Sequence, residues 1–211
     1  MEKSDLVEAY TNYILEEGKR PLNVFKFCKS LKIEENDFYQ IFGSFDAIEK
    51  YIFNHFFDET IKVLHNNEEF KDFSSKDKLL SFYYTIIENF TANRSIVLYL
   101  LDNKNPLKGL AKIHSIKSDF IKFIDDLDLE QIDIPLDQLK QFQEKGLGEM
   151  IWGQFLTIIK YWIKDDSVAF EKTDVFIEKS TTVGFELLNL TQLESVVDFG
   201  KFLFKDAFKM N

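Results

Sequence analysis

The chain has 211 residues with a net charge of −10, and 45% of its residues are hydrophobic. This length and composition exclude a disordered chain and favour one or two small domains with a buried core. A single cysteine excludes an intramolecular disulfide framework, and no apolar run approaches the roughly 18 residues of a membrane-spanning helix. The acidic N-terminus lacks the pattern of a signal peptide, so we expect a cytoplasmic protein.

Apolar residues at helical spacing predict three short helices and one long helix in the first third of the chain. We expect these helices at residues 4–17, from Pro21 onward, at about residues 34–41 and at about residues 45–65. Ser4 and Ser44 are the predicted N-caps of the first and fourth helices, and Gly18 ends the first. The expected core residues of the bundle are Phe25, Phe38 and Phe42. Short helices joined by tight turns are typical of a helix-turn-helix head.

The rest of the chain also has helical periodicity, and glycine and proline are scarce throughout. The expected helices cover residues 76–92, 94–103, 106–126, 147–164 and 171–189. Residues 127–146 are acidic and irregular, which predicts a loop with a short helix after Pro135. A last helix begins at Thr191, where Thr191 and Glu194 have the spacing of a capping box.

The segment 33–48 contains a recognisable motif in which Tyr39, Phe42 and Ser44 form a Tyr-x-x-Phe-x-Ser core. The flanking positions that match the same pattern are Ile33, Phe38, Ala47 and Ile48. This motif resembles the head of the TetR/AcrR family of bacterial regulators, and the resemblance covers about residues 4–60. It implies an all-α, TetR-like fold. The implied organisation is a helix-turn-helix head over residues 1–48, a helical ligand-binding and dimerisation domain over 49–190 and an amphipathic helix over 191–211.

Three positions depart from the family pattern. Lys32 replaces the turn glycine, at a position that favours a positive φ angle. Glu34 replaces the serine that caps the recognition helix, and Phe45 replaces a lysine that commonly contacts a phosphate. Tyr39 alone remains of the usual phosphate-contacting set. The resemblance and the neighbouring residues together give four DNA-facing candidates: Tyr39, Lys26, Lys29 and Asn36.

The charge of the head leaves two functional hypotheses open. Duplex DNA is bound largely through cations, yet the recognition helix offers Glu34, Glu35 and Asp37 and no cation. The resemblance implies a ligand-responsive transcriptional regulator that binds DNA and an apolar small molecule. The alternative is a TetR-fold protein that binds a lipid or isoprenoid and does not bind DNA. That architecture is similar to the accessory proteins of coenzyme Q biosynthesis.

Abundant phenylalanine, 23 of 211 residues, indicates an aromatic interior that suits an apolar ligand. The candidate pocket residues are Phe82, Tyr83, Ile86, Phe90, Tyr99, Phe120, Phe123, Trp152 and Phe155. The helices 147–164 and 171–189 stand where TetR-like proteins form a homodimer, and the alternative is a face packed within the chain. The candidate dimer residues are Ile151, Ile158, Ile159, Trp162, Leu187 and Leu188. We also expect Gly148, Gly153 and Gly184 to permit close helix approach.

Residues 193–209 form an amphipathic face that could dock on the protein itself or on a membrane surface. The sequence contains no Gly-rich phosphate loop and no nucleophile elbow, and its three histidines are widely spaced. We therefore expect neither an enzyme nor a metal or cofactor site. The expected partners are a second copy of the chain and an apolar small molecule or lipid, with DNA and a membrane surface as open alternatives.

Overall fold

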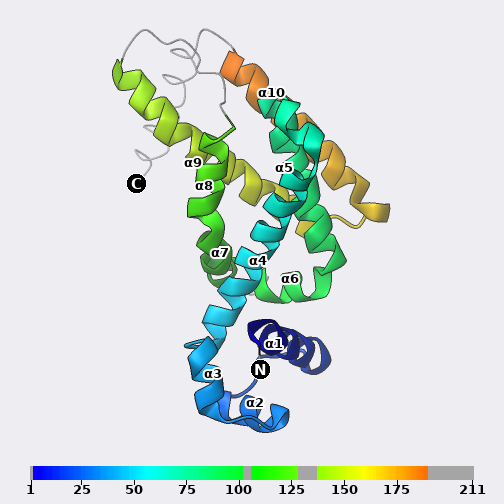
Figure 1. Cartoon of the computed structure of the whole chain (residues 1–211). Coiled ribbons are helices and arrows are strands. Elements are labelled where there is room, and N and C mark those ends of the chain that lie inside the picture. Colours follow the sequence, from blue (N-terminus) through cyan, green and yellow to red (C-terminus); the bar gives the residue numbers. More distant parts are fainter. Residues whose placement is uncertain (1, 102–105, 128–136, 190–211) are drawn as a thin grey trace, which may run out of the picture. The chain divides into compact units, whose positions relative to one another are not determined.

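The computed structural model describes residues 2–101, 106–127 and 137–189, and every regular element in these ranges is helical (Figure 1). The all-α prediction is therefore confirmed. The predicted last helix, residues 191–211, lies outside the described residues. Among the described helices, none combines the length and apolar character needed to cross a bilayer.

The chain forms two compact units: residues 1–71 with 82–123, and residues 72–81 with 124–211. The α-helices are α1 (Lys3–Glu17), α2 (Val24–Leu31), α3 (Glu35–Ile41), α4 (Phe45–Asn66), α5 (Ser75–Ala92), α6 (Arg94–Leu101), α7 (Pro106–Ile113), α8 (Lys117–Asp125), α9 (Asp137–Lys164) and α10 (Glu171–Asn189). Short 3-10 turns are η1 (Glu68–Asp72), η2 (His114–Ile116) and η3 (Val168–Phe170). The predicted head thus shares one compact unit with part of the predicted ligand-binding domain.

The helix ends follow the local chemistry of their residues, with one correction. Gly18 takes a left-handed conformation with φ of 66°, and it ends α1 as predicted. The Ser44 hydroxyl accepts a hydrogen bond from the Ala47 amide at 3.2 Å, which confirms the cap of α4. The prediction for Ser4 was wrong, because α1 begins one residue earlier and is capped from Glu2.

Three other predicted boundaries were wrong. The second helix does not begin at Pro21, because α2 starts at Val24 and Asn23 is its N-cap. Residues 106–126 are not one helix, because the 3-10 turn η2 separates α7 from α8. The predicted irregular segment 127–146 is helical from Asp137, so α9 starts ten residues before the expected residue 147. Polar and acidic composition indicated a loop, but it does not by itself prevent a helix from extending.

An aromatic cluster holds α1–α4 together in the first unit. Phe45 packs on Tyr10, Phe27 and Phe38 with ring centroids 5.1, 5.6 and 5.6 Å away. All four rings are buried, as is Phe42, so the core predictions for Phe38 and Phe42 are confirmed. The prediction for Phe25 was wrong, since that side chain is 57% exposed.

The phenylalanine cluster extends into the other helices of the first unit. Phe82 on α5 lies 5.3 Å from Phe120 and 4.9 Å from Phe123, measured between ring centroids. Gly109 lets α7 approach the end of α6, because a Cβ there would overlap the backbone of Leu101. Close approach at this crossing requires glycine.

The second unit is organised by the pairing of α9 with α10. Tyr161 and Phe176 stack with ring centroids 4.5 Å apart, and the Gln154 amide donates hydrogen bonds to the hydroxyls of Ser180 and Thr181. Apolar side chains of α9 form the buried side of this pair. They are Ile151, Trp152, Phe155, Ile158, Ile159 and Trp162.

Candidate functional site

The α2–α3 surface of the head carries all four predicted DNA-facing residues. Lys26 and Lys29 on α2 are exposed, as are Asn36 and Tyr39 on α3. The Tyr39 side chain is 53% exposed and packs edge-on against the buried ring of Phe38, 5.4 Å away. The structure therefore leaves the four side chains accessible to a partner, while Phe38 holds α3 in the head.

The start of α3 is acidic for a local reason. The Asp37 carboxylate accepts a hydrogen bond from the Glu34 amide at 3.1 Å, closing the first turn of the helix. Carboxylates at this position also interact favourably with the helix dipole. The same charges repel phosphate, and α3 itself contains no lysine or arginine. This surface therefore offers polar groups for hydrogen bonding but no cation on α3.

The turn between α2 and α3 keeps the geometry expected of a glycine. Lys32 follows α2 with φ of 58° and ψ of 39°, which is the left-handed region. A residue with a Cβ is strained there. The expectation of a positive φ at Lys32 is confirmed.

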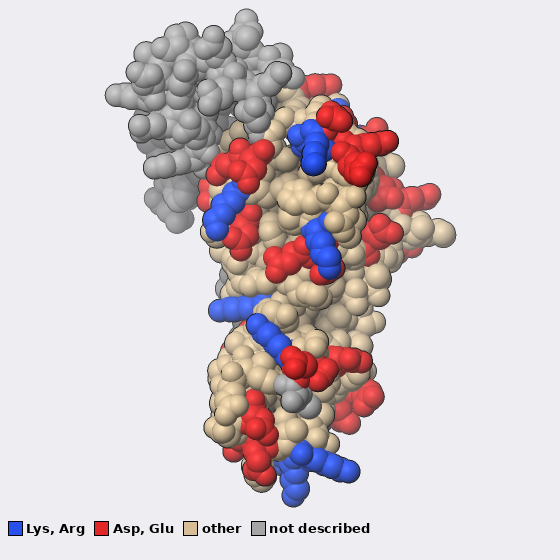
Figure 2. All heavy atoms as spheres, viewed as in Figure 1, with Lys and Arg blue, Asp and Glu red and all other residues tan. Residues whose placement is uncertain are grey.

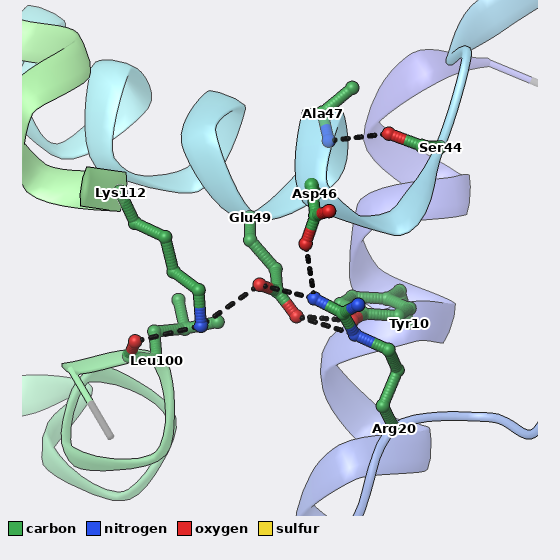
Figure 3. A network of polar contacts seen from close by, with 8 residues as sticks. All are labelled: Tyr10, Arg20, Ser44, Asp46, Ala47, Glu49, Leu100 and Lys112. Carbon is green, nitrogen blue, oxygen red and sulfur yellow. Dashed lines mark hydrogen bonds and ion pairs between the residues drawn. The ribbon is translucent and has the colours of Figure 1, made fainter. Parts of the chain in front are cut away.

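A buried carboxylate that the sequence analysis missed lies on α4, between Lys112 on one side and Tyr10 and Arg20 on the other (Figure 3). Glu49 on α4 is fully buried and accepts a hydrogen bond of 2.6 Å from the Tyr10 hydroxyl of α1. Arg20 reaches the same carboxylate through Nε at 3.1 Å and Nη2 at 2.8 Å. Lys112 of α7 adds a third contact, with Nζ 3.0 Å from Oε2. Glu49 is thereby compensated by two cations and one hydroxyl.

Each partner of Glu49 is held by a further contact or by burial. Lys112 also donates to the Leu100 carbonyl at 2.9 Å, and Arg20 contacts Asp46 at 2.6 Å. The Arg20 hydrogen bond holds the pKa of Asp46 below its usual value. Burial, followed by the charge of Glu49, raises the pKa of the Tyr10 hydroxyl well above its usual range. The ion pairs and hydrogen bonds of this network therefore connect α4 with α1, with α7 and with the end of α6.

One sequence signal could have found Glu49. It stands among Ile48, Ile52 and Phe53, which are all buried, so it occupies the apolar side of α4. A carboxylate on that side must find partners, because an uncompensated buried charge is very costly. Its partners come from positions 29 to 63 residues away, and spacing along the chain could not identify them.

The predicted pocket residues fall into both units. Phe82, Tyr83, Ile86, Phe90, Phe120 and Phe123 are buried in the first unit, and Tyr99 there is partly buried. Trp152 and Phe155 belong to the second unit, with ring centroids 5.6 Å apart. Burial raises the pKa of the Tyr83 hydroxyl well above its usual value. The side chains thus form apolar, aromatic interiors, and their role in ligand binding stays a prediction.

The predicted dimer residues of α9 lie inside their own chain. Ile151, Ile158, Ile159 and Trp162 are all buried, while the side chains of Leu187 and Leu188 are not among those described. A side chain buried in this way is not available to a second copy. Among the described side chains of α9 and α10, the large apolar ones that are exposed are Met150, Tyr161, Val175 and Val183.

Two of the three helix glycines do not serve contacts within the chain. A Cβ added at Gly153 or at Gly184 would have no other heavy atom within 4 Å, apart from its own local backbone and chain neighbours. At Gly153 and Gly184 the expected close helix approach therefore does not occur between described parts of one chain. Each glycine still costs about 1 kcal/mol against alanine in a helix interior.

The helices α5–α10 also match a known family. A family model described as "Tetracyclin repressor-like, C-terminal domain" matches residues 78–203, which is more than half of the chain. No curated protein matches the chain. The family match covers the C-terminal helices, while the Tyr-x-x-Phe-x-Ser motif lies in the N-terminal head, so the two similarities come from different segments. The chain belongs to the tetracyclin repressor-like (TetR) family.

Proposed function

We propose that this protein is a ligand-responsive transcriptional regulator. In this proposal residues 1–48 form the DNA-binding head, and residues 49–190 form the domain that binds an apolar ligand and dimerises. The exposed set on α2 and α3 carries the proposal. Lys26 and Lys29 would neutralise backbone phosphates, and Asn36 and Tyr39 would hydrogen-bond to a base edge or a phosphate.

The aromatic interior of the first unit supports an apolar ligand. The rings of Phe82, Phe120 and Phe123 pack on one another, and Tyr83 is buried beside Phe82. Interiors of this kind bind ligands through apolar contact, with few polar groups to fix orientation. A lipid-like or isoprenoid-like molecule fits this chemistry better than a charged one.

The Glu49 network supports a response to that ligand. Lys112 and the end of α6 lie on one side of the buried carboxylate, and α1 with Arg20 lies on the other (Figure 3). A ligand that displaced α7 would weaken the compensation of Glu49, because an ion pair in a low-dielectric interior depends strongly on distance. A different position of the head, in which Glu49 is better compensated, would then become more favourable.

A homodimer would use the exposed side of α9 and α10. Met150, Thr157 and Tyr161 are spaced by seven and four residues, which places them on one side of α9. Gly153 lies on the same stripe, and its open surroundings would let a helix of a second copy approach closely. The residues proposed for the interface therefore differ from the buried residues predicted from sequence.

Selection of genomic DNA fragments by the purified full-length protein tests the regulator directly. We expect a palindromic sequence to be enriched at about 50 mM salt and bound more weakly at about 200 mM, because phosphate contacts release counterions. The double variant K26Q/K29Q should reduce the slope of log affinity against log salt by about two, and K62Q on α4 serves as the control. Absence of enrichment at both salt concentrations, with folded dimeric protein, would contradict the proposal.

A second candidate is a lipid-binding accessory protein of the same fold that does not bind DNA. The acidic first turn of α3 favours it, since Glu34, Glu35 and Asp37 stand where a phosphate would approach. Both candidates contain an apolar ligand, so a lipid extracted from the protein does not separate them. The DNA selection does, because only the regulator has an operator.

A further inference from the structure

The segment 18–33 has the opposite charge to the rest of the chain. It contains five of the 26 lysines and arginines and none of the 36 acidic residues. Arg20 is used internally by Asp46 and Glu49, but the four lysines Lys19, Lys26, Lys29 and Lys32 are exposed. Figure 2 shows basic side chains grouped at the end of the head where α2 lies, whereas elsewhere on the visible face basic and acidic side chains are mixed.

Two large apolar side chains are exposed within this basic segment. Leu22 is 76% exposed and Phe25 is 57% exposed. Within α2, Phe25 and Lys29 are four residues apart and therefore lie on one side of the helix, while Leu22 precedes the helix and Lys32 follows it. Phe27 and Cys28, by contrast, are buried in the head. We call Leu22, Phe25 and the four lysines the basic-apolar face.

The lysines of this face suit any partner that carries phosphates, but the exposed Leu22 and Phe25 need an apolar environment as well. Duplex DNA would pair with the lysines but would leave Leu22 and Phe25 without an apolar environment. An acidic protein surface would satisfy the charges alone. A bilayer with anionic headgroups offers both a layer of phosphates and an apolar layer beneath it, and lysine stems reach between the two. We propose that the basic-apolar face docks on an anionic lipid bilayer, with the lysines at the phosphates and with Leu22 and Phe25 in the apolar boundary.

The net charge of −10 does not prevent this contact. At physiological salt, charges more than about 8–10 Å from the membrane are largely screened, so the lysines at the contact act more strongly than distant acids. The acidic start of α3 sets one border of the face. The binding should consequently be weak, salt-dependent and limited to this side of the head. It does not depend on the proposed regulator function.

Sedimentation with vesicles tests the proposal on the full-length protein. We expect partition to phosphatidylcholine vesicles containing about 30% phosphatidylglycerol, and none to pure phosphatidylcholine, at about 100 mM salt. The variant K26Q/K29Q should lower the partition coefficient about 30-fold, since each lysine near the surface contributes about a factor of five. The variant L22S/F25S should lower it at least about tenfold through lost apolar insertion.

A matched control comes from α4, where Lys62 and Val63 are both exposed. The variant K62Q/V63S should leave the partition within about twofold of the original. All substituted side chains are at the surface, and thermal unfolding should confirm that each variant remains folded.

The outcomes separate this inference from the regulator proposal. Random duplex DNA, tested in parallel, should lose affinity with K26Q/K29Q but not with L22S/F25S if the head binds DNA. Vesicle binding that survives L22S/F25S would overturn the bilayer proposal, as would binding unchanged by K26Q/K29Q, which would place it elsewhere on the chain. A protein that binds DNA and no vesicles would also overturn it while leaving the regulator proposal intact.

Discussion

Two buried carboxylates, one in each compact unit, are compensated in different ways. Glu49 in the first unit is compensated by Tyr10, Arg20 and Lys112, which come from distant parts of the chain. Asp165 in the second unit is compensated by Ser167 and Thr173, which lie two and eight residues further on. The first arrangement depends on where helices pack, whereas the second is completed by the turn itself.

The local arrangement consists entirely of hydrogen bonds. The amides and hydroxyls of Ser167 and Thr173 donate to Asp165 at 2.6 to 2.9 Å. Burial acts to raise the pKa of Asp165, but these hydrogen bonds outweigh it and hold the pKa well below its usual range. Asp165 also lies at the start of α10, where the helix dipole favours a negative charge.

The two carboxylates differ in how strongly their compensation depends on the positions of the helices. Local hydrogen bonds keep Asp165 satisfied as long as the α9–α10 turn exists. Glu49 is satisfied only while α1, α4 and α7 keep their positions, so a movement of α7 has an energetic consequence at the head. A displacement of α7 would therefore change the energy of the Glu49 network. The hydrogen bonds of Asp165 would keep the α9–α10 turn in place whatever the positions of α1, α4 and α7.

The largest expected effect comes from breaking the remote network. Substitution of Lys112 by Met should lower the free energy of unfolding by about 3 kcal/mol, because it removes one of two cations from a buried carboxylate. Chemical denaturation measures it. The control is K122M on α8, whose exposed pair with Asp119 should contribute little to the free energy of unfolding. Equal effects of K112M and K122M would show that Glu49 does not depend on Lys112.

A slightly smaller effect is expected at the local site. Asp165→Ala should cost about 2 kcal/mol, because the hydroxyl of buried Thr173 and the first amides of α10 lose their acceptor. The neighbouring Asp166 is largely exposed, so Asp166→Ala should cost less than about 0.5 kcal/mol. A cost for Asp165→Ala above that for K112M would reverse the comparison.

The pH dependence of stability sharpens the distinction further. The folded-state pKa of Asp165 lies below its unfolded value, so its contribution is complete above about pH 4 and declines as the pH falls toward the folded-state pKa. Denaturation midpoints measured from about pH 6 to pH 2.5 should fall less steeply for Asp165→Asn than for the unmodified chain. Parallel curves for the two proteins would exclude this linkage.

The smallest expected effect concerns a single helix cap. Ser44→Ala should lower the free energy of unfolding by about 1 kcal/mol, since the Ala47 amide loses its acceptor. Ser4→Ala is the matched control, because Ser4 lies within α1 and not at its cap, and thermal unfolding should show almost no change. A larger loss for Ser4→Ala would restore the original capping prediction.

Short-range chemistry accounts for the correct predictions from sequence. Gly18 and Ser44 were assigned from their immediate neighbours and Lys32 from the family pattern, and the structure confirms each of them. The errors have two physical causes. Phe25 was assigned to the core by residue type, although its position on α2 faces away from Phe27. The start of α9 was placed too late because an acidic composition does not exclude a helix.

The candidate sites also divide into residues that local sequence could identify and residues that only helix packing brings together. The accessible set on α2 and α3 could be named because the motif places Asn36 and Tyr39 on one short helix, and the preceding predicted helix contains Lys26 and Lys29. The partners of Glu49 and the interior position of Ile158 and Trp162 could not be named. Periodicity identifies an apolar helix side but not the surface that covers it.

The sequence by itself determined the all-α class, the helix-turn-helix head, most helix ends and the acidic character of α3. These properties follow from interactions between residues a few positions apart. Only the tertiary structure decided that Phe45 joins the aromatic core, that Leu22 and Phe25 remain exposed, and that Glu49 is enclosed by two cations. These properties depend on which helices pack together, and packing brings together groups that no local pattern connects.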